Sequence, residues 1–186
     1  MPVAGYVIEL ITAGAGASLW IVLLILAFTG HGWLPLDAIK QGGIFVLLSP
    51  FIYVIGAVID RLVDNFFDRV FKENFQSPSF LTREGYFRAR TRIYLKSDAL
   101  RGLLEYGKMR IRLCRTWTFN SIGILIAADL WLLLPNTPLR HWPDRLGAIA
   151  AVTIGMSLSA WLSFRAWKIL SIKEAEFMAR MDEELK

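Results

Sequence analysis

The sequence predicts an all-α, polytopic membrane protein with four transmembrane helices and a helical cytoplasmic extension between the second and the third. The 186 residues are 55% hydrophobic, and the apolar residues fall in long blocks with almost no charge. These blocks cover residues 10–36, 41–59, 116–139 and 146–164, and Asp129 is the one charged residue within them. Each is close to or longer than the roughly 20 helical residues that cross a bilayer core about 30 Å thick. The basic residues are concentrated between the second and third blocks.

The first two spans are expected at residues 6–29 and 43–60. The stretch before residue 10 contains no Lys or Arg, so it lacks the positive region of a cleavable signal peptide, and we expect the first helix to be retained. Within this helix, Ala13 with Ala17 and Gly14 with Ser18 are pairs of small residues four positions apart. Such pairs let helices approach closely, within one chain or between chains.

Residues 61–115 are expected to form two or three helices below the membrane, as extensions of the neighbouring spans. Asp60, Asp64 and Asp68 recur every four residues and therefore share one helix face. We interpret them as an ion-pair row whose partners are arginines of the returning helix. The alternation in residues 86–96 also fits a strand, but no partner strand is visible and the flanking segments have helical spacing, which favours a helix.

The last two spans are expected at residues 116–134 and 146–167, followed by an amphipathic cytoplasmic tail at 168–186. In this tail, Ile172, Ala175, Met178 and Met181 recur every three residues and form an apolar seam, which Leu185 extends. The seam could pack on the basic segment of the same chain, which we favour, or on a helix of another protein. All elements belong to a single membrane domain that covers residues 1–186.

The charge distribution predicts the orientation in the membrane. Of the 21 basic residues, 13 lie in residues 61–115, whereas the connectors at 30–42 and 135–145 hold one and two. Basic residues are retained on the cytoplasmic side during insertion, so the middle segment and both termini are expected to be cytoplasmic, in the inner (plasma) membrane. Tryptophans at both predicted interfaces, Trp33 and Trp142 outside and Trp117 and Trp167 inside, fit the aromatic belts of such proteins.

The basic residues of the middle segment are the first candidate site, as a face that docks an anionic ligand, an acidic partner or lipid. The candidates are Arg88, Arg90, Arg92, Lys96, Arg101, Lys108, Arg112 and Arg115. The segment 61–115 has 13 basic and 6 acidic residues, a net charge of +7, so contact with an anionic leaflet is expected. Specific nucleic-acid binding is not expected, because no recognition module is visible. Ion pairing within the chain is the plainer interpretation of the same residues.

Asp129 is the second candidate, because a charge within the bilayer core has to be neutralised, paired or hydrated. Ser49, Tyr53 and Thr153 lie at a comparable depth in the other predicted spans and could form hydrogen bonds with it. Two interpretations remain open: a structural hydrogen bond between helices, or a proton or cation site that forms a ring of carboxylates in a homo-oligomer.

The remaining motifs argue against an enzyme. The sequence contains no glycine-rich phosphate loop, no paired-histidine zinc motif and no nucleophile elbow. Cys114 is the single cysteine, so neither a disulfide within the chain nor a cysteine zinc site is expected, and we expect no metal and no cofactor. The sequence therefore predicts a non-enzymatic inner-membrane anchor or sensor whose basic helices and acidic tail dock a cytoplasmic partner. The alternative is a homo-oligomeric ion channel or proton-linked pore that uses Asp129.

Overall fold

The structure is a computed structural model that describes residues 2–30, 32, 43–71, 83–96, 98–139 and 141–184. These residues form helices and connecting turns, with no strand among them, so the predicted all-α class is confirmed for this part of the chain. The helices are α1 (Pro2–Thr29), α3 (Gly43–Phe71), α4 (Arg83–Lys96), α5 (Asp98–Leu133) and α6 (Trp142–Glu184).

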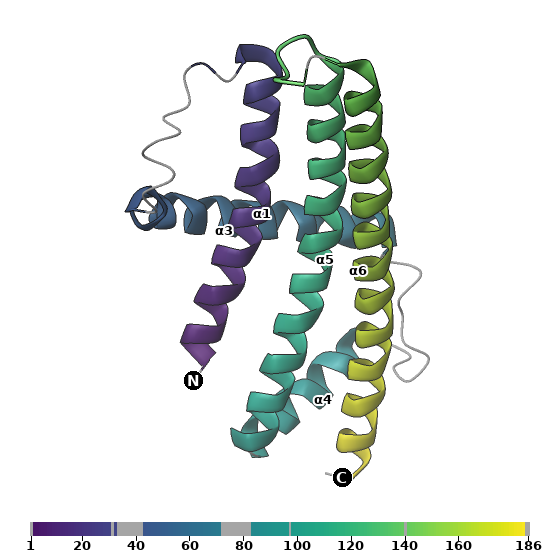
Figure 1. The fold of residues 1–186 in the computed structure, drawn as a ribbon. Helices are drawn as coiled ribbons and strands as arrows, with labels where there is room; N and C mark the ends of the chain where they lie inside the picture. Colours follow the sequence, from purple (N-terminus) through teal and green to yellow (C-terminus); the bar gives the residue numbers. More distant parts are fainter. Residues whose placement is uncertain are drawn as a thin grey trace.

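Three helices, α1, α5 and α6, run side by side, and both chain termini lie toward the same lower end (Figure 1). By length and composition, these three are long and apolar enough to cross a membrane. At their upper end Gly30 closes α1 in a left-handed conformation, with φ of 76°. The Asn136 side chain between α5 and α6 donates a hydrogen bond to the Ala27 carbonyl, at 3.0 Å, and so fixes this connection to the end of α1.

Helix α3 differs from the expected second span, because it lies across α1, α5 and α6 instead of running alongside them (Figure 1). The predicted continuation of 43–60 beyond residue 60 is present, since α3 is one helix that ends at Phe71. Two glycines let it cross α1 at very short range. A methyl group at Gly14 of α1 would overlap the Ile52 carbonyl, and one at Gly56 of α3 would overlap the Leu10 carbonyl. The two backbones therefore touch where the helices cross, and four parallel spans are not confirmed.

Past this crossing, α3 continues over α5 and α6 and forms the main core. Ala17, Ile59, Val63, Phe67 and Trp167 are buried together. The Phe67 and Trp167 rings meet edge to face with centroids 4.8 Å apart. The polar Asp64 on the same helix pairs with Arg115 of α5. Apolar packing and one ion pair thus hold α3 crosswise.

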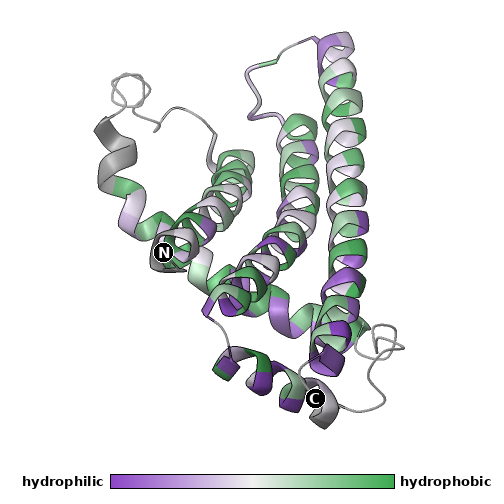
Figure 2. Ribbon diagram, turned by 90° about the horizontal axis from the view of Figure 1, so that it is seen from below, coloured by the Kyte–Doolittle hydropathy of each residue, from purple (hydrophilic) through white to green (hydrophobic). Residues whose placement is uncertain are grey.

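The lower part of the molecule is a small helical unit that we call the basal region: α4, residues 98–115 of α5 and residues 168–184 of α6. Its core consists of Ile93, Leu104 and Met178, each at most 2% exposed. Hydrophilic residues are prominent in α4 and near the C-terminus (Figure 2). The predicted helices of the middle segment and tail are therefore present, and α5 and α6 each join their expected span to the basal region without a break.

Candidate functional site

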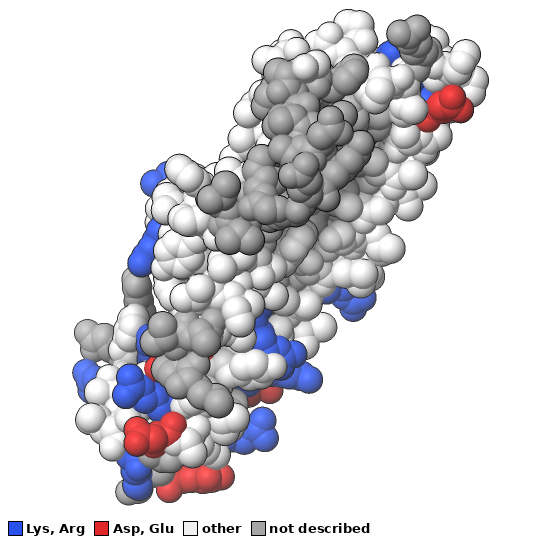
Figure 3. Space-filling model, turned by 60° about the vertical axis from the view of Figure 1, so that its left-hand side comes forward, with Lys and Arg blue, Asp and Glu red and all other residues white. Residues whose placement is uncertain are grey.

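Charged side chains gather at the lower end of the molecule, where Lys, Arg, Asp and Glu are mixed, while most of the long central part is uncharged (Figure 3). The space-filling view thus separates a body with few charged side chains from a charged base. The charged groups fall into two sets, one around Tyr94 in the basal region and one where α1, α3 and α5 meet.

The C-terminal tail packs on the basic segment of its own chain. Met178 is fully buried against Ile93 and Leu104, and Ala175 is 9% exposed. Arg92 of α4 lies 3.0 Å from the Asp182 carboxylate of α6. The favoured interpretation of the apolar seam therefore agrees with these contacts, although Leu185 lies outside the described residues.

The ring of Tyr94 is surrounded by three cationic groups. The Arg90 Cζ atom lies 5.2 Å from the ring centroid, the Lys108 Nζ atom 5.5 Å and the Arg101 Cζ atom 5.7 Å. Cations at this range are attracted to an aromatic ring, but they repel one another. The set, called the Tyr94 cluster below, consists of Arg90, Tyr94, Arg101 and Lys108.

Two carboxylates accompany this cluster. Glu105 accepts a hydrogen bond from Arg101 Nε at 3.2 Å. Glu174 of α6 lies against Gly107, where an added methyl group would be 3.8 Å from its carboxyl group. Burial raises the pKa of the nearby Tyr86 hydroxyl, and the Glu174 charge adds to the increase. Lys108 Nζ is buried and has no hydrogen-bond partner among the described residues. The three cations of the cluster and the two carboxylates beside it together carry a net charge of +1, and the Lys108 ammonium lacks a hydrogen bond within the described residues.

The eight basic residues named from the sequence do not form one continuous face. Arg90, Arg101 and Lys108 converge on Tyr94, and Arg92 pairs with Asp182. Arg88 and Lys96 are exposed on α4. Arg112 and Arg115 turn inward, away from the cluster, and pair with acidic residues of α1 and α3.

The second set of charges, called the charged layer below, consists of Glu9, Asp60, Asp64, Arg112 and Arg115. Arg112 Nε lies 3.2 Å from Glu9 Oε1, and Arg115 pairs with Asp64. Glu9 and Asp60 are only 4% and 5% exposed. The predicted aspartate row is therefore divided, because Asp60 and Asp64 face the bundle while Asp68 is exposed. Sequence reasoning missed Glu9, although a single carboxylate at the edge of an apolar block was a signal for it.

Asp129 and Thr153 are brought together between α5 and α6. The Thr153 hydroxyl donates a hydrogen bond to Asp129 Oδ2 at 2.9 Å. Asp129 Oδ1 is buried and has no hydrogen-bond partner within the described ranges. Ser49 and Tyr53 are not brought to this site. They lie on α3 at or next to its crossing with α1, which is at Gly14, 15 residues before the upper end of α1, whereas Asp129 is only 4 residues before the upper end of α5.

Asn120 is a further buried polar residue that sequence reasoning missed. It is completely buried, donates to the Ala13 carbonyl at 2.9 Å and accepts from Trp20 Nε1 at 3.3 Å. Gly16 leaves the space for its amide. These bonds satisfy Asn120 within the bundle, so we assign it to helix packing.

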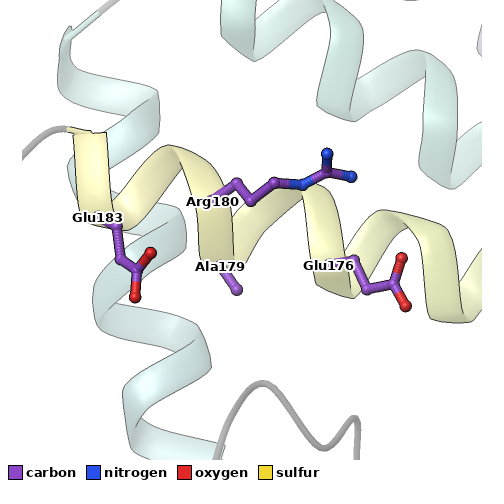
Figure 4. Close-up of a pocket in the computed structure, with 4 residues that line it drawn as sticks. All are labelled: Glu176, Ala179, Arg180 and Glu183. Atoms are coloured by element: carbon purple, nitrogen blue, oxygen red, sulfur yellow. The ribbon is translucent and has the colours of Figure 1, made fainter.

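No metal site emerges from the described residues. No cluster of His, Cys, Asp and Glu in them could hold a metal ion. A shallow hollow on the surface of the tail is lined by Glu176, Ala179, Arg180 and Glu183 (Figure 4). All four side chains come from α6, so this hollow lies along a single helix and does not enclose a ligand.

Comparison with protein-family models, with curated proteins and with solved structures finds no match for this chain.

Proposed function

We propose that this chain is a non-enzymatic anchor or sensor of the inner (plasma) membrane, and that its basal region docks an acidic cytoplasmic partner. The observation that carries the proposal is the Tyr94 cluster, in which three cations share two carboxylates and Lys108 Nζ lacks a hydrogen-bond partner in the described part of the chain. An approaching carboxylate or phosphate would offset the excess positive charge and add charge-assisted hydrogen bonds to the arginines of this cluster.

The proposed placement has α1, α5 and α6 across the bilayer and the basal region in the cytoplasm. It is supported by the three apolar helices and by the 13 basic residues within 61–115. Both termini lie at the lower end of the bundle and are then cytoplasmic. This placement requires residues 30–42, most of which lie outside the described residues, to connect the outer end of α1 with α3 on the inner side. A fourth span at 43–60 is not included, because these residues belong to α3, which lies across α1 (Figure 1).

The depth of the Tyr94 cluster favours a soluble partner over lipid headgroups. Along α5, Lys108 and Arg101 lie 7 and 14 residues before Arg115, which is about 10 and 21 Å at 1.5 Å per residue. The headgroup layer extends only about 5–8 Å beyond the hydrocarbon on each side. With Arg115 near the membrane surface, the cluster therefore lies below the headgroups, where a cytoplasmic protein can reach it.

The docking proposal is tested with purified protein in nanodiscs of phosphatidylcholine, which carries no net charge, and a fluorescent polyglutamate peptide as the acidic probe. Replacing Arg90 by Glu is expected to weaken binding at least tenfold, since a lost charge-assisted hydrogen bond is worth about 1.5–3 kcal/mol. Arg110→Glu is the matched control, because Arg110 lies on the same basal region beside Tyr106 and the charge change is equal. No binding by the wild type, or an equal loss in both variants, would refute a specific site.

A second candidate function, the proton-linked pore of a homo-oligomer, is favoured by Asp129 alone, whose Oδ1 is buried without a hydrogen bond from any described residue. If Asp129 carries protons, Asp129→Asn lowers proton flux into liposomes at least tenfold. The fold should persist, because an amide oxygen still accepts the Thr153 hydroxyl. Asp144→Asn, in the exposed first turn of α6, is the control. Equal flux in the wild type and in Asp129→Asn, or no flux in either, removes this candidate.

A further inference from the structure

The second half of α3 has three distinct sides. The side that packs on the bundle is buried and contains Ile59, Val63 and Phe67. A second side is apolar and about half exposed up to residue 66, with Val58 at 54%, Leu62 at 53% and Phe66 at 49%, and it ends at the exposed Arg69 in the last turn. The third side is polar and exposed, and it contains Arg61, Asn65 and Asp68. An exposed apolar side next to an exposed polar side is typical of a helix that lies in a membrane interface.

Two contacts with α5 show which side faces which end of the bundle. Phe66, on the apolar side, meets Phe119 with ring centroids 6.3 Å apart. Asp64, which borders the polar side, pairs with Arg115. Phe119 lies one helical turn closer than Arg115 to the upper end of α5. The apolar side of α3 is therefore directed toward the apolar part of the bundle, and its polar side toward the basal region.

The level of α3 along the bundle matches the lower edge of a bilayer. Gly14, where α3 crosses α1, is 15 residues before the end of α1 at Thr29, which corresponds to about 22 Å. Arg115 is 18 residues before the end of α5 at Leu133, about 27 Å. A hydrocarbon core is about 30 Å thick. If the upper ends of α1 and α5 lie at the outer surface, α3 lies close to the inner one.

We infer that residues 58–68 of α3 lie in the plane of the cytoplasmic membrane surface, with the apolar side in the acyl chains and the polar side in the headgroup layer. The partner of this exposed apolar side is then the lipid bilayer itself. The inference depends on the proposed placement of α1, α5 and α6 across the membrane, but not on the docking of an acidic partner.

Spin labels distinguish an in-plane helix from a spanning one. Single cysteines are introduced at positions 58, 62 and 66 on the apolar side and at 61, 65 and 68 on the polar side, in a chain with Cys114→Ser. Nitroxide accessibility to oxygen and to a water-soluble nickel complex gives the depth of each label in nanodiscs. An in-plane α3 places labels 58, 62 and 66 at one depth in lipid and exposes 61, 65 and 68 to nickel. A spanning α3 would instead give a steady change of about 12 Å between 58 and 66.

Two reference labels separate failure of this inference from failure of the membrane placement. Ile154→Cys, at an exposed site on α6 within the predicted fourth span, should be deep in lipid, and Lys96→Cys, at the exposed end of α4, should be in water. With both references as expected, a depth gradient along α3, or nickel access at all six positions, overturns the in-plane helix. A label at 154 that is open to nickel overturns the placement of α6 in the bilayer and the inference with it. All eight positions are exposed. The label at 66 replaces the Phe66 ring that meets Phe119, so the depths at 58 and 62 carry the comparison on the apolar side.

Discussion

Replacing Gly14 with leucine is expected to displace α3 from α1 and to lower the free energy of unfolding by about 3 kcal/mol or more. Overpacking usually costs about 1–3 kcal/mol, because neighbours shift to make room. Here the first added carbon would overlap the Ile52 carbonyl, and the reciprocal Gly56 is equally close to the Leu10 carbonyl. Neither backbone can rotate out of the way as a side chain would. The change is measured by detergent unfolding of the purified protein, followed by helical circular dichroism and tryptophan fluorescence.

Gly155→Leu is the matched control, because no atom lies within 4 Å of a methyl group placed there and Gly155 is exposed on α6. It should unfold at nearly the wild-type detergent concentration. If Gly14→Leu matches this control, α1 and α3 do not touch at these glycines. Residues 43–60 would then be free to run alongside α1, as the sequence alone predicted.

The course of most helices could be predicted from the sequence, because the apolar blocks and helical spacing mark them directly. The direction of α3 could not. Its first half is an uncharged block of spanning length. Composition therefore does not distinguish a helix that spans the membrane from one that lies across the other helices. The difference depends on Gly14 and Gly56, which are 42 positions apart in the chain. Sequence reasoning identified Gly14 as a close-contact residue but could not name its partner.

The charged residues show the same limit. Asp129 could be found from the sequence because it interrupts a long uncharged block. Its hydrogen bond with Thr153 was among those that the sequence predicted as possible. Arg112 and Arg115 belong to the same basic segment of the sequence as the cations around Tyr94, yet they turn toward α1 and α3. Which side of a helix is covered depends on the neighbouring helices, and periodicity gives only the relative positions of residues on that helix. That three cations converge on Tyr94 could be found only from the three-dimensional structure.

The ion pair between Arg115 and Asp64 is expected to stabilise the crosswise position of α3. The Arg115 side chain is only 12% exposed and that of Asp64 31%, and Arg115 also lies over the Phe67 ring at 6.0 Å. Removal of one partner from a buried pair costs about 3–5 kcal/mol, because the other charge remains without compensation. Since Asp64 is partly hydrated, we expect about 2–3 kcal/mol for Arg115→Met and less for Asp64→Asn. Detergent unfolding measures both.

The double variant, Asp64→Asn with Arg115→Met, shows whether the two side chains act as a pair. We expect it to be more stable than the sum of the single effects predicts, by about 1–3 kcal/mol, because neither charge is then left alone. The exposed pair Arg101 and Glu105, in one helix and 3.2 Å apart, is the control, and its coupling should be about 0.3–0.5 kcal/mol. Strictly additive effects at Asp64 and Arg115 would mean that the pair does not hold α3. In that case the position of α3 would depend on the glycine contact and the apolar core around Phe67, and the charged layer would be a consequence of the fold.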